Sequence, residues 1–153
     1  MTDEELLEKI KEFKFWTGKS ELTLEDIAML QPGLARIMPE VGQRTWKLFY
    51  AAKAENWPLA KFQYKEIAGL MEMGAITRPK HAEALNQFLV ENWKPVGDAI
   101  DKKDFAAVET TFNLAIEAAN AYHELKEKAY LVWKLPDTPP PDLVMEPRGK
   151  RPA

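Results

Sequence analysis

Four long stretches of this chain repeat apolar residues every three or four positions, which is the period of an amphipathic α-helix. The stretches cover about residues 34–55, 58–74, 80–102 and 105–128. Short connectors join them, and helices joined by short connectors pack as antiparallel neighbours. The pattern therefore predicts an all-α fold built on an up-down-up-down four-helix bundle.

Capping residues and prolines predict where these helices begin and bend. Asn56 and Asp104 precede the second and fourth stretches, and their side-chain oxygens can accept the first free N–H groups of a helix. Pro39 lies inside the first stretch, so we expect a kink or a helix start close to it. Pro95 lies inside the third, and that helix should bend one turn earlier. In the second stretch, Phe62 is expected to point into the core.

The two ends of the chain differ in character from the bundle. The N-terminal end predicts a short helix at about residues 3–16, which Thr2 and Glu5 would start as a capping box. The C-terminal end is rich in proline and is expected to follow an extended path. No stretch is rich in strand-forming patterns, so we expect no sheet. The predicted segments are a helical appendage, the bundle domain and the Pro-rich tail, at residues 1–30, 31–135 and 136–153.

Composition argues against several classes of function. The net charge of -3 disfavours nucleic-acid binding, which needs a basic face. The chain has no cysteine, which excludes disulfides, thiolate metal sites and thioether-linked haem. No apolar run approaches the roughly 20 residues of a membrane-spanning helix, and the acidic start at residues 2–5 is unlike a signal peptide. We expect no membrane contact and a cytoplasmic location, or a periplasmic one if a leader peptide has been removed.

Signatures of catalysis and of metal binding are not found in the sequence. It contains no phosphate-binding Gly loop, no nucleophile elbow and no zinc pattern. Di-iron bundles need a Glu three residues before a His on two helices. The residues three before His81 and His123 are Arg78 and Asn120. We therefore predict neither a catalytic residue nor a metal ligand.

Several short pieces of the chain, taken in order and spacing, point to one family. The pieces are Arg44–Ala51, Glu55–Ala60, Glu66–Ile67, Pro79, Phe88–Leu89, Ala99–Ile100, Asp104–Phe105, Phe112, Asn120–His123 and Pro136–Pro141. Together they resemble a family of small bacterial mono-haem c-type cytochrome-like proteins, which are four-helix bundles distantly similar to cytochrome c′. The resemblance runs from about Leu34 to Pro147 and implies the same bundle fold.

The same resemblance implies a lost cofactor. In that family, haem is held by Cys-x-x-Cys and by the histidine that follows as axial ligand. Here residues 119–123 read Ala-Asn-Ala-Tyr-His, so Ala119 and Tyr122 stand at the two cysteine positions and His123 at the axial position. A second histidine of the family corresponds to Thr45. The resemblance therefore implies the fold without haem, and we expect no cofactor.

The candidate site is the remnant of the haem pocket. We assign to it His123, Tyr122, Ala119, Thr45, Trp46 and Phe49. Protein interiors are close-packed and a phenol is larger than a thiol, so we expect Tyr122, with Trp46 and Phe49, to fill or reduce the pocket. His123 is open to three interpretations. It is a core histidine bonded to a neighbour, a vestigial ligand beside another bound molecule, or an axial ligand of loosely held haem.

Three functions follow from these expectations. The first is a non-catalytic, haem-free cytochrome-like bundle that binds a protein partner, or a small apolar or aromatic ligand, in the remnant pocket. Its protein contact, including a homodimer, would run through the bundle or the N-terminal helix. The second is a redox, haem-binding or metal-binding protein, or an enzyme, that uses His123 without covalent attachment. The third is a structural scaffold subunit with a closed core.

Overall fold

Most of the chain is helical, as the apolar spacing predicts. The computed structural model describes residues 1–149. The chain divides into two compact units, Met1–Pro32 and Gly33–Ala153. The Pro-rich segment after residue 135 therefore belongs to the same unit as the long helices.

The N-terminal unit combines two short helices with a two-stranded sheet. Its elements are α1 (Asp3–Glu12), β1 (Lys14–Trp16), β2 (Glu21–Thr23) and α2 (Leu24–Leu30). The capping box at Thr2 is confirmed, because its hydroxyl accepts the Glu5 N–H and the Glu5 carboxylate accepts the Thr2 N–H. A second capping box, between Thr23 and Asp26, starts α2.

The expectations of a helix to residue 16 and of no sheet are both wrong. Helix α1 ends at Glu12, and Phe15 then pairs with Leu22 in an antiparallel hairpin. Aromatic side chains favour extended backbone. Gly18 takes a φ of 91° between the strands, a conformation that side-chain-bearing residues rarely adopt. Phe13 continues the helical spacing of Leu6 and Ile10, but the helix ends before it and the first strand of the hairpin begins directly after it.

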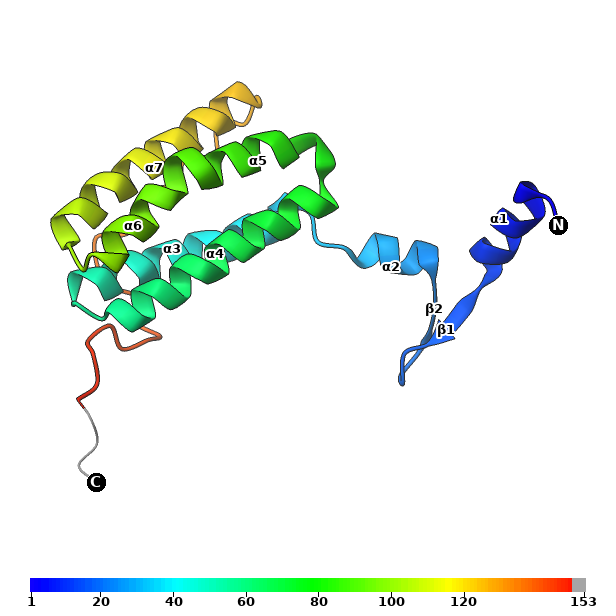
Figure 1. The fold of residues 1–153 in the computed structure, drawn as a ribbon, viewed down its shortest axis with the longest axis horizontal. Coiled ribbons are helices and arrows are strands. Elements are labelled where there is room, and N and C mark those ends of the chain that lie inside the picture. The colour runs from blue at the N-terminus through cyan, green and yellow to red at the C-terminus, as the bar shows by residue number, and fades with distance from the viewer. Residues whose placement is uncertain (150–153) are drawn as a thin grey trace. The chain divides into compact units, whose positions relative to one another are not determined.

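The second unit contains the long helices. Its α-helices are α3 (Leu34–Lys53), α4 (Trp57–Thr77), α5 (Ala82–Phe88), α6 (Lys94–Asp101) and α7 (Phe105–Leu125), with a 3₁₀ turn η1 (Pro79–His81) and a π-helical turn η2 (Leu89–Trp93). Figure 1 shows α3, α4, the continuous α5–α6 segment and α7 side by side, each running opposite to the one before it. Helix α3 packs on α4 and α7, and α4 also packs on α5 and α6.

The predicted helix starts at Asn56 and Asp104 are confirmed, and the two prolines differ in whether the α-helix is interrupted near them. Asn56 and Asp104 are both N-caps, accepting the N–H groups of residues 59 and 107. Pro39 lies inside α3, which begins five residues earlier. The turn before Pro95 is the π-helical one, in which the Lys94 N–H bonds to the Leu89 carbonyl. A proline ring clashes with the carbonyl four residues back, and the wider turn relieves this clash.

One continuous core fills the space between the long helices. Its largest fully buried side chains are Trp93, Phe112, Leu48, Ile67, Ile100, Val96 and Val108. Phe62 is 51% exposed, so its predicted inward position is wrong. The next residue, Gln63, points inward instead and accepts a hydrogen bond from Arg44 Nη1 at 3.0 Å. The Arg44 guanidinium also lies 5.9 Å from the Phe62 ring centre, so Phe62 packs beside a charge rather than in the core.

Candidate functional site

The degenerate box at residues 119–123 lies near the end of α7, where one face holds the chain that follows the helix. Asn120 Nδ2 donates to the Trp133 carbonyl, and Asn120 Oδ1 accepts from the Trp133 N–H, both at 2.9 Å. His123 Nδ1 lies 2.8 Å from the Leu131 carbonyl oxygen. Residues three apart share a helix face. Asn120 and His123 therefore anchor the returning segment against α7 together.

The hydrogen bond of His123 decides which ring nitrogen is protonated. A carbonyl oxygen can only accept, so His123 carries its hydrogen on Nδ1. In the neutral ring, Nε2 then bears the lone pair and is the nitrogen able to bind a metal. Within residues 1–149, no three His, Asp or Glu side chains gather where they could hold a metal ion. His123 thus has a backbone partner, and no carboxylate cluster accompanies it in that part of the chain.

Tyr122 faces a different partner from its two neighbours in the box. Its hydroxyl lies 3.0 Å from His81 Nδ1, on the 3₁₀ turn before α5. Lys126 Nζ lies 5.5 Å from the centre of the Tyr122 ring. Burial raises the pKa of the Tyr122 phenol. Burial, followed by the charges of Lys80 and Lys126, lowers the pKa of His81 below its usual 6.5. Both groups are therefore held in their neutral forms at pH 7.

The predicted pocket residues on α3 are satisfied locally. Thr45 is buried, and its hydroxyl donates to the Val41 carbonyl at 2.7 Å. Phe49 is buried and makes edge or tilted ring contacts with Tyr50, Phe105 and Phe112, whose centroids lie 5.5, 5.5 and 4.9 Å away. Aromatic rings therefore occupy the space beside Phe49.

Trp46 and Ala119 complete the predicted set. The Trp46 Nε1–H donates to the Thr138 carbonyl at 2.7 Å, so this indole faces the C-terminal tail. Ala119 is half-buried on α7. The described contacts of five of the six residues point in four directions, and His123 faces the Leu131 carbonyl. Phe49 and Thr45 face the interior and their own helix, Tyr122 faces η1, and Trp46 faces the tail.

Three residues of this region did not enter the predicted pocket. His81 and Trp133 bond directly to the degenerate box, and Asn120 lies within the box but is not among the six predicted pocket residues. The only sequence signal for this anchor is Asn120 near the end of a helix, followed by the apolar and aromatic residues 130–133. The partner itself depends on how residues 126–135 turn back, which periodicity does not encode.

Two depressions of the surface lie away from these residues. One of about 520 Å³ lies between the start of α4 and the tail, lined by Asn56, Leu59, Asp142, Leu143, Val144, Glu146 and Arg148. Another of about 650 Å³ runs along α1. None of the six predicted pocket residues lines either one. The chain offers shallow surface sites there, and both are formed by its terminal segments.

Comparison of the chain with protein-family models, curated proteins and solved structures finds no match. Among the helices of residues 1–149, none has the length and apolar character needed to cross a bilayer. The function must therefore be argued from the contacts and exposed surfaces of the chain itself.

Proposed function

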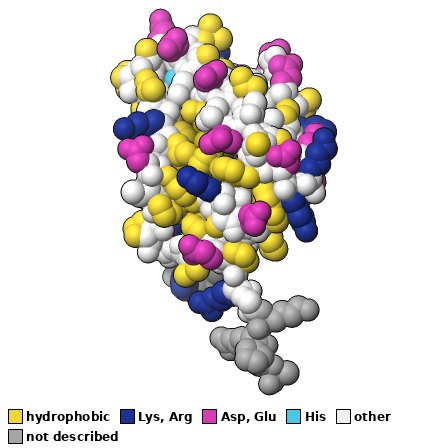
Figure 2. Space-filling model, turned by 90° about the vertical axis from the view of Figure 1, so that its left-hand side faces the viewer, with side chains coloured by type: hydrophobic (Ala, Val, Ile, Leu, Met, Phe, Trp, Pro, Cys, Tyr) yellow, Lys and Arg dark blue, Asp and Glu magenta, His cyan; other side chains and the backbone are white. Residues whose placement is uncertain are grey.

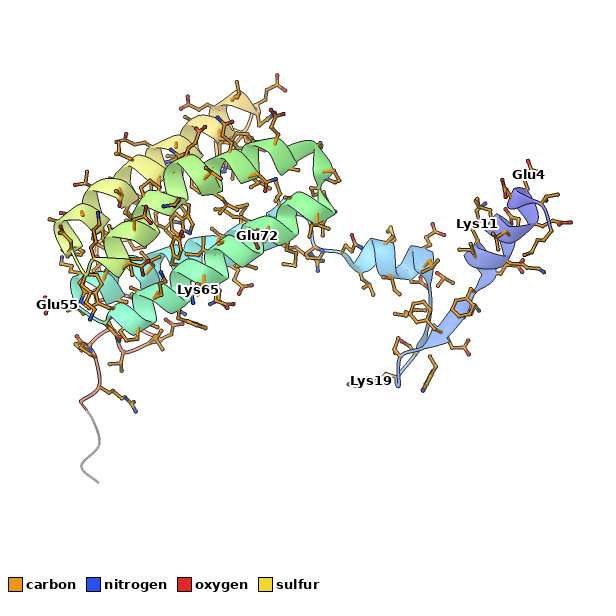
Figure 3. All side chains as sticks on the ribbon, viewed as in Figure 1. Glu4, Lys11, Lys19, Glu55, Lys65 and Glu72 are labelled. Carbon is orange, nitrogen blue, oxygen red and sulfur yellow. The ribbon has the colours of Figure 1, made fainter. Side chains whose placement is uncertain are left out.

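We propose that this chain is a non-catalytic, haem-free four-helix-bundle protein that binds another protein chain through its N-terminal unit. One observation carries the proposal. No residue of Met1–Pro32 is buried, although the unit has defined helices and strands. Trp16 is 67% exposed and Met29 81%. Figure 3 shows the labelled Glu4 and Lys11 projecting from α1, and Lys19 at the turn between β1 and β2.

The energetics of the N-terminal unit favour a partner. Burying one large apolar side chain stabilises a fold by roughly 1.5–3 kcal/mol. The N-terminal unit gains no such free energy, because none of its apolar side chains is buried. Chains below about 40 residues usually need disulfides, a metal or association to fold stably. The chain has no cysteine, and residues 1–149 form no metal cluster. Association with an apolar surface would supply the burial that the unit lacks.

The spacing on α1 describes the surface that it would meet. Leu6 and Ile10 are four residues apart on α1, so they lie on one face of the helix, and the exposed Phe13 follows directly after the helix end. Helices with this spacing dock by laying the apolar face in a groove of the partner. The unit carries eight Asp and Glu and four Lys, a net charge of 4 − 8 = -4. We expect the partner to offer an apolar groove with a basic rim.

Two observations support the haem-free bundle within this proposal. The alternating directions of α3, α4, α5–α6 and α7 are those of an up-down-up-down bundle (Figure 1). The aromatic contacts of Phe49 take up space that a large planar ligand would need. On the face drawn in Figure 2, acidic and basic side chains are interspersed around hydrophobic ones, unlike the basic stripe of nucleic-acid-binding proteins. The packed aromatic rings disfavour a ligand held inside the bundle, and the mixed surface charge disfavours nucleic acid. A protein partner is the kind of partner that both observations leave.

Hydrogen exchange tests the proposal directly. In a dilute, monomeric sample, the α1 amides should exchange at least about 100-fold faster than those of α4, because no buried contact holds α1 closed. A photo-crosslinking residue at position 10 should join the chain to a partner, whereas the same residue at Lys65, exposed on α4, should not. A monomer whose α1 amides are as protected as those of α4 would contradict the proposal, because the unit would then be stable alone.

A further inference from the structure

The C-terminal tail lies against the outer face of α3 and is held there by a small set of polar contacts. The Tyr50 hydroxyl donates to the Pro136 carbonyl at 2.9 Å, and the Trp46 Nε1–H donates to the Thr138 carbonyl at 2.7 Å. Lys47 Nζ bonds to the Asp142 carboxylate at 2.7 Å. The three donors stand within two turns of one helix.

The two aromatic contacts recognise the backbone of the tail. Trp46 and Tyr50 are four residues apart on α3, so they lie on one face. Their acceptors are carbonyl groups two residues apart in the tail. Proline lacks an N–H and cannot continue a helix, so a Pro-rich segment leaves its carbonyls free for such donors. Grooves that bind proline-rich peptides likewise use aromatic side chains.

We propose that the Trp46–Lys47–Tyr50 face of α3 is a receptor for a proline-rich peptide segment of another chain, occupied in this structure by the protein's own tail. The ligand would present two carbonyls two residues apart, and a carboxylate four residues after the carbonyl bound by Trp46. The spacing from Thr138 to Asp142 sets that distance. This surface lies outside the N-terminal unit, so the proposal is independent of the function proposed above.

The tail has the properties of a bound peptide as much as those of a structural element. Its described residues, 136–149, form no helix or strand. Its apolar anchor is Met145, which is buried in the core, while Leu143 and Val144 beside it are exposed. The hydrogen bond and charge of Lys47 lower the pKa of the Asp142 carboxyl, so this carboxylate keeps its charge to a lower pH than a free aspartate does. Pro140 is buried as well as Met145. A segment held by a few polar contacts and these two apolar residues can be exchanged for another of the same pattern.

Cutting the intact chain between Lys134 and Leu135, at an inserted protease site, tests the proposal. Every residue of the tail is then present, but the tail is no longer tethered. A fluorescent peptide of residues 135–147 should bind the cleaved chain with a Kd of about 100 μM or tighter. It should bind the uncut chain roughly ten-fold more weakly, because the tethered tail competes at an effective concentration of about 1 mM.

Conservative variants separate recognition from packing. Trp46→Phe and Tyr50→Phe each keep an aromatic ring and remove one donor, so each should weaken peptide binding to the cleaved chain by roughly three- to ten-fold. Tyr130→Phe removes the same hydroxyl from an exposed ring outside the face, and should leave binding unchanged. A peptide with Asp142→Asn should bind more weakly than the wild-type peptide, and the difference should shrink at high salt.

Three results would overturn the proposal. The first is a labelled peptide that binds the cleaved chain no tighter than about 1 mM. The second is unchanged binding in both Trp46→Phe and Tyr50→Phe. The third is loss of helical circular dichroism on cleavage, because the tail would then be part of the fold and no replaceable ligand.

Discussion

The side-chain amide of Asn120 forms two hydrogen bonds with the backbone of Trp133, one to its N–H and one to its carbonyl, both 2.9 Å long. An amide is the side chain that can satisfy both groups at once, because it carries a donor and an acceptor side by side. The bonds place the Trp133 ring against Phe112, at 6.3 Å between centroids, and against the backbone of Gly42 on α3. One residue of the degenerate box thereby links α7 to α3.

Asn120→Ala should therefore destabilise the fold. It leaves the Trp133 N–H and carbonyl without their partner in a half-buried place, at a cost of about 1–3 kcal/mol in the free energy of unfolding. Asn113→Ala is the matched control, because Asn113 is exposed on the same helix and its replacement only improves helix propensity, by about 0.5 kcal/mol. Urea unfolding followed by circular dichroism measures both. Equal midpoints for the two variants would contradict the role of the amide.

The features that local sequence encodes were predictable. Asn56 and Asp104 cap their helices because the relevant bond joins residues three apart, and the interruption before Pro95 depends on one ring and one carbonyl. The buried stripe followed the helical period in the same way. Such features need no knowledge of the rest of the fold.

The features that depend on distant residues were not predictable. Tyr122 bonds to His81, which is 41 residues away, and Trp46 bonds to Thr138, which is 92 away. Spacing along one helix says which side chains share a face, but not what covers that face. Prediction from spacing can also fail within a single helix. Phe62 was expected in the core, but Gln63, one position later, is the residue that is buried.

Close packing makes Gly97 a sensitive position. A Cβ added there would clash with the Tyr64 ring, which stacks on Trp93 with 5.6 Å between centroids. Gly97→Ala should lower the free energy of unfolding by about 1–3 kcal/mol, because the stacked pair must move. Gly69→Ala on exposed α4 surface meets nothing within 4 Å, and should instead stabilise the helix by up to about 1 kcal/mol. Thermal unfolding that lowers the Tm of both variants alike would contradict this account.

The His81–Tyr122 pair predicts a pH dependence of stability. Burial and two lysines lower the pKa of His81 in the folded chain below its usual 6.5, so the unfolded chain binds the proton more tightly. The contribution is complete above pH 6.5 and is lost as the pH falls through the folded pKa. The free energy of unfolding should therefore decrease below pH 6.5, and His81→Gln should remove that part of the slope. Proton NMR should show His81 titrating below 6.5, and a value at or above 6.5 would exclude the effect.

Haem binding provides the sharpest test of the proposed haem-free character. Neither Ala119 nor Tyr122 can form a thioether bond, because neither side chain carries a thiol. Tyr122 is held by His81, and Phe49 packs among aromatic rings, so a macrocycle would have to displace buried side chains. Protein expressed with ample haem should purify without a strong Soret band, and His123→Ala should leave its absorption spectrum unchanged. A stoichiometric Soret band that disappears in His123→Ala would show that His123 binds haem, and the redox alternative would replace the haem-free proposal.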